Sequence, residues 1–180
     1  MSAFATEAAV RQPSSVETEG DGVHHNPNIR DPRLARLYDY WCERRGSDAM
    51  PRRCDIDPLK FPYVLGNIML VEVQREPQRF RVRLHGSHMV QRAGYDMTGK
   101  WLDELPGPEY RAYVIERCRG LVETRKPLVT VHDRILDGRA WRYEVLWLPF
   151  SENGRDADVL LCALIYQDKP LPQTDPLSPA

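Results

Sequence analysis

The sequence predicts an α+β domain: one antiparallel sheet of five strands, with helices on one face and an N-terminal helix on or near the other. Helical and alternating apolar patterns follow in the order helix, two strands, short helices, a longer helix, three strands. Short polar segments separate the strands in each group, as in antiparallel hairpins. The last two strands are apolar on both faces, so both faces of the sheet must be covered.

The segments at the two ends differ in composition from the rest of the chain. Residues 1–30 and 169–180 hold few large apolar side chains and are rich in polar residues and proline. Such segments bury too little surface to offset the entropy of ordering, so both are expected to be disordered tails. No basic segment followed by an apolar run marks a secretory signal, and no window is long and apolar enough for a membrane helix. We expect a cytoplasmic protein without membrane contact.

The 25 basic residues of the 180-residue chain nearly balance its 26 acidic ones. A balanced charge provides no general field for nucleic acid, so a nucleic-acid partner is not expected.

The first element predicted is a helix over residues 31–46. Asp31 suits the N-cap, Pro32 suits the first helical position, and Gly46 suits the end. An apolar stripe at helical spacing must cover either the rest of the domain or a partner chain; its members are Leu34, Leu37, Tyr38 and Trp41. We expect this helix to cover the free face of the sheet, and we also predict these four residues as a dimer interface.

The central part combines short helical segments with two strands. Pro58 and Pro62 limit residues 55–67 to broken helical turns. Beyond them the periodicity predicts strands at 67–74 and 79–85 and helices at 87–93 and 109–124.

Three strands complete the predicted domain, at 127–136, 140–150 and 158–167. Asp137-Gly138 is a hairpin turn signal between the first two. The alternation of the first strand predicts an exposed His132, and the carboxylates of Asp133 and Glu144 are expected to be solvated.

A series of motifs resembles the PAS domain, and in particular a small bacterial PAS family. The motifs are D-P…F-P…L with a following E-V at 57–73, R-F-R-x-R-L-x-G at 79–86, G-x-D-x-T-G at 94–99 and E-x-L-x-L-P-F at 144–150. The resemblance covers about 50–168. It implies a five-stranded antiparallel sheet and a stand-alone sensory or regulatory module, not an enzyme. Such a module binds a small molecule, a signalling protein or both, and often forms homodimers through an N-terminal helix.

The resemblance also implies where a ligand would bind, between the sheet and the helices at 87–93 and 109–124. The residues predicted to line that pocket are Met89, Tyr113, Arg117 and Trp147. Arg117 lies beside the apolar stripe of its helix and can bind a carboxylate through two parallel hydrogen bonds.

The ligand itself is unknown, and three cofactor classes are disfavoured. Haem is disfavoured because helix 109–124 has no histidine, and an adduct-forming flavin because helix 87–93 has no cysteine. A metal is disfavoured because His85 and His88 have no cysteine or carboxylate at ligand spacing beside them. No catalytic residue is predicted. The alternatives are a small α+β cavity enzyme, such as a lyase or isomerase, and a purely structural dimerisation module.

A basic row alternates along strand 79–85, formed by Arg79, Arg81 and Arg83. Such a row can bind an acidic partner, but charges on an edge strand also prevent aggregation. We favour the second interpretation.

Overall fold

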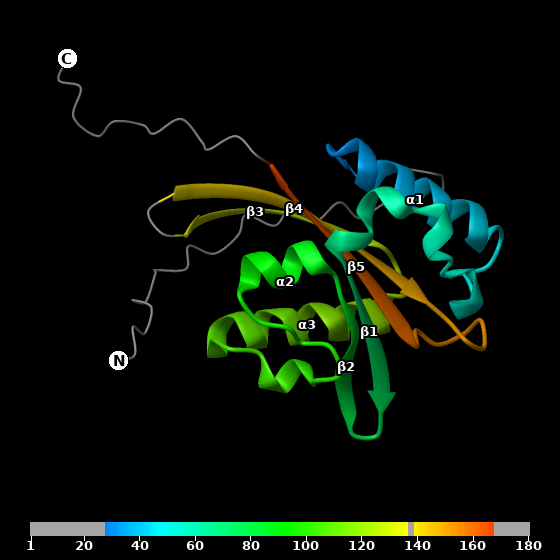
Figure 1. Ribbon diagram of the computed structural model, residues 1–180. Coiled ribbons are helices and arrows are strands. Elements are labelled where there is room, and N and C mark those ends of the chain that lie inside the picture. The colour runs from blue at the N-terminus through cyan, green and yellow to red at the C-terminus, as the bar shows by residue number, and fades with distance from the viewer. Residues whose placement is uncertain (1–27, 137–138, 168–180) are drawn as a thin grey trace, which may run out of the picture.

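The computed structural model describes residues 28–136 and 139–167, and a single antiparallel sheet forms their centre (Figure 1). The strand order is β2-β1-β5-β4-β3, so β2 and β3 are the edges. The strands are β1 (Ile68–Arg75), β2 (Gln78–His85), β3 (Leu128–Leu136), β4 (Arg139–Phe150) and β5 (Val159–Gln167). The helices are α1 (Pro32–Arg45), α2 (Ser87–Ala93) and α3 (Pro108–Thr124), with short 3-10 turns η1 (Arg53–Asp55), η2 (Pro58–Lys60), η3 (Pro62–Asn67) and η4 (Leu102–Glu104). The predicted α+β class is confirmed.

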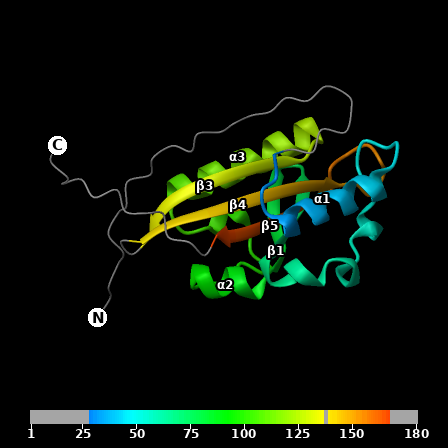
Figure 2. The same cartoon turned by 90° about the horizontal axis from the view of Figure 1, so that it is seen from above.

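Helix α1 covers one face of the sheet, while α2 and α3 lie on the other (Figures 1 and 2). The carboxylate of Asp31 caps α1 by accepting a hydrogen bond from the backbone N–H of Arg33 at 2.9 Å. Leu34, Leu37 and Trp41 are at most 1% exposed, and the indole N–H of Trp41 donates to the carbonyl of Pro149 on β4 at 2.8 Å. These three side chains of the predicted dimer interface are therefore covered within one copy. A contact between two copies through α1 would have to use its outer side.

The carboxylate of Glu144 fixes the start of α1 to the sheet. Its two oxygens accept hydrogen bonds from the backbone N–H groups of Arg30 and Asp31, each at 2.9 Å. Glu144 is fully buried, so the expectation that it is solvated is wrong. The sequence could not show this, because the covering segment lies more than 110 residues away along the chain.

The described residues include the last residues of the predicted N-terminal tail. Ile29 packs against the core and Arg30 binds Glu144, although both were assigned to the N-terminal tail. The other tail residues, 1–27 and 169–180, lie outside the described residues, as do Asp168 and the turn at Asp137-Gly138. In the part of the chain that is described, no helix has the length and hydropathy to span a membrane.

The face opposite α1 is packed with apolar side chains from α3 and the sheet. Val114, Cys118 and Leu121 of α3 are buried, as is Cys162 of β5. Burial raises the pKa of both thiols, and the neighbouring Cys118 raises that of Cys162 further. Both cysteines therefore stay protonated and act as small core residues.

Two glycines allow the chain to pass closely where β2 leads into α2. The N–H of Gly86 donates to the carbonyl of Ile68 at 2.7 Å, and a Cβ on Gly86 would lie 2.5 Å from the carbonyl oxygen of Gly66. A Cβ on Gly66 would in turn lie 2.7 Å from the ring of His88. The sheet, η3 and α2 can meet here because neither position carries a side chain.

Replacing Glu144 by Gln tests how α1 is held. The amide keeps one acceptor but presents an N–H₂ group to the other backbone N–H, so one buried donor loses its partner. The free energy of unfolding, measured by urea denaturation, is expected to fall by about 1–3 kcal/mol. Glu152→Gln is the matched control, since the Glu152 side chain is 57% exposed, and should cost less than about 1 kcal/mol. Equal losses in the two variants would show that Glu144 does not anchor α1.

Two glycine-to-alanine variants should change stability in opposite directions. Gly86→Ala forces a methyl group against backbone and is expected to destabilise the protein by about 1–3 kcal/mol. Gly120 lies inside α3 with no atom within 4 Å of an added Cβ. Gly120→Ala is therefore expected to stabilise it by about 0.5–1 kcal/mol. Thermal and urea unfolding measure both, and a neutral Gly86→Ala would contradict the close approach.

Candidate functional site

Four rings form a continuous row on the face of the sheet that α2 and α3 cover. We call Tyr113 of α3, His132 of β3, Tyr143 of β4 and Tyr166 of β5 the aromatic row. Centroid distances are 5.7 Å from Tyr113 to His132, 4.8 Å from His132 to Tyr143 and 5.4 Å from Tyr143 to Tyr166. The first contact is edge-on at 88°, and the second is stacked at 14°. These are favourable arrangements for aromatic pairs.

Strand register produces the row. His132 pairs directly with Tyr143, and Tyr143 pairs directly with Tyr166. Residues opposite each other in an antiparallel sheet project from the same face, so three neighbouring strands place their rings side by side. Helix α3 then adds Tyr113 from above.

An arginine lies at each end of the aromatic row. The guanidinium carbon of Arg117 is 5.1 Å from the ring centroid of Tyr113, and that of Arg92 in α2 is 4.1 Å from the ring centroid of Tyr166. Both are cation–π distances. Inside the row, a ring nitrogen of His132 lies 2.8 Å from the hydroxyl of Thr130. The row thus combines stacking surface, a polar ring and two cations.

The four predicted pocket residues fall into two pairs. Tyr113 and Arg117 are half-buried and belong to one end of the aromatic row. Met89 and Trp147 are buried, at 8% and 6% exposure, and form part of the core.

The sequence interpretation missed His132, Tyr166 and Arg92. It placed His132 on an exposed face, which is wrong, because the residue is only 6% exposed. The alternation of the strand correctly places His132 on the same face as Thr130. Which face of the strand is buried depends on the pairing with β4 and on α3, and this pairing brings His132 against Tyr143 and Tyr113.

The two central histidines have separate partners. The Nδ1 atom of His85 accepts a hydrogen bond from the backbone N–H of Met97 at 3.3 Å. Nδ1 of His88 lies 3.0 Å from the side-chain oxygen of Asn67. Among residues 28–136 and 139–167, no three His, Cys, Asp or Glu side chains gather as metal ligands would.

The arginines of β2 make contacts within the chain. Arg79 binds the carboxylate of Asp103 at 2.7 Å and lies 4.1 Å from the ring centroid of Trp101. Arg81 donates to the carbonyl of Gly99 at 3.2 Å, and Arg83 lies 4.0 Å from Glu72. Their strand is an edge of the sheet, as the interpretation of the basic row assumed.

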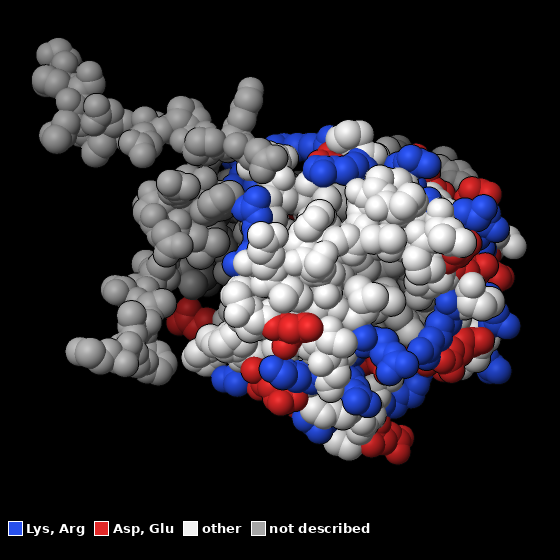
Figure 3. Space-filling view, in the orientation of Figure 1, with Lys and Arg blue, Asp and Glu red and all other residues white. Residues whose placement is uncertain are grey.

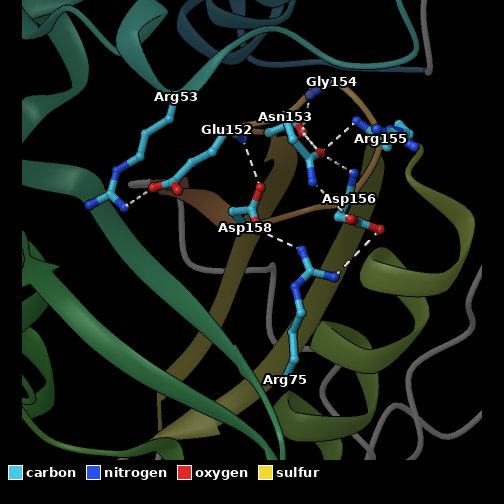
Figure 4. A network of polar contacts seen from close by, with 9 residues as sticks. Arg53, Arg75, Glu152, Asn153, Gly154, Arg155, Asp156 and Asp158 are labelled. Atoms are coloured by element: carbon cyan, nitrogen blue, oxygen red, sulfur yellow. Dashed lines mark hydrogen bonds and ion pairs between the residues drawn. The ribbon is translucent and has the colours of Figure 1, made fainter.

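A second polar network stabilises the loop between β4 and β5 (Figure 4). The side-chain oxygen of Asn153 accepts hydrogen bonds from the backbone N–H groups of Arg155 and Asp156. Arg75 binds Asp156 and Asp158, so the loop is tied to the end of β1. The carboxylates of Glu152, Asp156 and Asp158 all have partners within the network, which supports a structural role.

Positive and negative side chains lie beside each other on the surface of the protein. Figure 3 shows Lys and Arg beside Asp and Glu around the rim of one face, with a largely uncharged centre. On this face there is no extended surface of a single sign.

Comparisons with known proteins concern the fold and the family. Two solved structures are similar to the chain, a variant of RsLOV and the PAS domain of Bordetella pertussis BvgS. The RsLOV match has 14% identity, a TM-score of 0.40 and covers 59% of this chain and 65% of the other, so this chain spans just under two thirds of it. The BvgS match has 21% identity, a TM-score of 0.39 and covers 63% of this chain and 87% of the other.

No curated protein sequence matches the chain. The family model described as PAS domain matches residues 29–165, well over half of the chain. That range begins just before the residues that Glu144 binds, includes α1, and ends within β5. The resemblance predicted from the motifs is confirmed, and the chain belongs to the PAS domain family.

Proposed function

We propose that this protein is a non-catalytic PAS regulatory module in signalling, and that it binds a small anionic ligand with a planar group at the aromatic row. The observation that carries the proposal is the arginine at each end of the row, Arg92 and Arg117. A planar group can stack on the rings, and a carboxylate can bind a guanidinium through two hydrogen bonds.

The remainder of the sheet face that α2 and α3 cover offers fewer polar groups to a ligand than the aromatic row does. Apart from the row, this face of the sheet presents mostly apolar side chains that are buried, among them Val71, Val82, Trp147, Leu160 and Cys162. Such a surface can bury an apolar group but cannot orient it. Ligand sites in proteins combine an apolar wall with a few convergent polar groups, which fits the row better than the remaining core.

The surroundings of the acidic and thiol groups support a non-catalytic role. Glu144 is occupied by two backbone donors, and Asp103 is paired with Arg79. The raised pKa values of Cys118 and Cys162 keep both thiols protonated and poorly nucleophilic. None of these groups combines an available nucleophile or base with a partner that would activate it.

The proposed output is contact with a signalling protein or with a second copy of the chain. The outer side of α1 carries the exposed charged residues Arg36, Asp39 and Glu43, so a contact there would be polar. Among the residues whose exposure is described, Leu59, Leu65 and Leu84 are large apolar side chains exposed elsewhere. Exposed apolar side chains of this size are typical of contact surfaces when they lie together.

Aromatic carboxylates test the ligand proposal. Isothermal titration of the full chain with benzoate and indole-3-acetate, and with benzyl alcohol as a neutral control, should show binding of the carboxylates only. Arg117→Gln should weaken that binding about 10- to 100-fold, the loss expected for one charged hydrogen-bonding partner. Arg119→Gln on the exposed side of α3 is the matched control and should leave it unchanged.

Native mass spectrometry of the purified protein, compared with its denatured mass, would show a ligand retained from the cell. Equal affinities for wild type and Arg117→Gln, or equal binding of benzyl alcohol, would overturn the assignment of the site.

A further inference from the structure

His85 closes a short segment onto the edge of the sheet. We call residues 96–101 the strap, since they run beside β2. The N–H of Gly99 donates to the carbonyl of Val82 at 2.7 Å, and the N–H of Val82 donates to the carbonyl of Lys100 at 2.8 Å. Trp101 forms a further bridge with Arg81. The strap therefore occupies backbone groups that an edge strand would otherwise leave open.

The start of the strap is held by His85. The Nδ1 atom of its ring accepts the hydrogen bond from the N–H of Met97, and its backbone N–H donates to the hydroxyl of Thr98 at 3.2 Å. The imidazole is 5% exposed, and Met97 is 2% exposed. Because Nδ1 accepts, the neutral ring carries its proton on Nε2.

Protonation makes this hydrogen bond impossible. A charged imidazole has N–H groups at both nitrogens, so Nδ1–H and the N–H of Met97 would point at each other. The carboxylate of Asp96 is an alternative acceptor, since its Oδ1 lies 3.7 Å from Nδ1. That oxygen already accepts from the N–H of Thr98 at 2.8 Å, so a turn of the ring toward it disturbs the strap at two residues.

Burial and the nearby charge of Asp96 have opposite effects on the pKa of His85. Burial lowers the pKa of His85 below its usual 6.5, and the carboxylate of Asp96 partly opposes this. The pKa of Asp96 is itself lowered, first by its hydrogen bonds from Thr98 and also by His85 and Lys100, so it is ionised across the range of interest. The ring of Tyr95 lies 6.5 Å away from the ring of His85, centroid to centroid.

The sign of the pH effect follows from the lowered pKa. Above pH 6.5 the ring is neutral in both the folded and the unfolded chain, and the Met97 hydrogen bond is intact. As the pH falls from 6.5 to the pKa of the folded state, the unfolded chain binds more protons, so stability falls. Below the folded pKa the ring is charged in both states.

We propose that His85 is a pH-responsive latch, which holds the strap against β2 through Met97 when neutral and releases Met97 in favour of Asp96 when protonated. Release loosens the cover of the β2 edge at mildly acidic pH.

His88, three residues further on, provides an internal contrast. The side-chain amide of Asn67 donates to the carbonyl of Leu164 at 2.9 Å, so its oxygen is the atom that faces His88. Nδ1 of His88 is therefore the donor, a role that it keeps when the ring becomes charged. Titration of His88 leaves its hydrogen bond in place.

NMR spectroscopy of the full chain tests the latch. In a titration from pH 8 to pH 5, the amide signals of Met97 and Thr98 should shift with the same midpoint as the ring of His85, below 6.5. His88→Gln should leave that transition unchanged. His85→Gln should abolish it, because the glutamine oxygen can accept from Met97 at every pH. Asp96→Asn should move the midpoint to lower pH, since the charged ring loses the negative charge that stabilises it.

Three results would overturn the proposal. They are a Met97 amide that does not respond while His85 titrates, a transition that survives in His85→Gln, and a midpoint that follows His88. If His85→Gln does not fold, the wild-type comparison of the Met97 midpoint with the two ring midpoints decides the question alone.

Discussion

The structure depends on one constraint, a sheet that is apolar on both faces. In β4, Leu146, Leu148 and Phe150 alternate with Val145 and Trp147, and all five are buried. Neither face can be left to water, so the fold needs one cover made by α2 and α3 and a second made by α1 (Figures 1 and 2). The second cover is a short helix outside the sheet. Polar contacts fix its position, from Glu144 to the chain entering α1 and from Trp41 to Pro149.

Several buried polar groups of this fold hold separate elements together or stand in the candidate site. Glu144 and Tyr143 are neighbours on β4 and therefore project from opposite faces. Glu144 accepts hydrogen bonds from the backbone at the start of α1, and Tyr143 lies in the aromatic row between His132 and Tyr166. At the far end of β2, His85 is buried but satisfied by the backbone of the strap. A buried polar group lowers the free energy of unfolding little when it is paired and much when its partner is lost. Loss or gain of one hydrogen bond at such a group can therefore change the stability of the segment it holds.

Much of this fold could be predicted from the sequence, because local patterns determine it. The N-cap at Asp31, the alternation of residues 79–85 and the αL glycine at Gly94 each act over a few residues, and the elements they predicted lie within about two residues of those observed. The candidate site could be predicted less completely from the sequence. Tyr113 and Arg117 could be named from their place on a helix, whereas His132 and Glu144 were misread, because their burial depends on strand register and on a distant segment. Register is a property of two strands together, and no single stretch of sequence contains it.

The burial of α1 within one copy affects how the domain can be divided. The motifs that resemble the PAS domain begin near residue 50, so a shortened protein starting there would keep every recognisable motif. It would lose Leu34, Leu37 and Trp41 together with the backbone donors of Glu144. An apolar sheet face with a buried carboxylate at its centre would then be open to solvent. Such a fragment would associate through that face, and its aggregation would reflect a missing part of the domain.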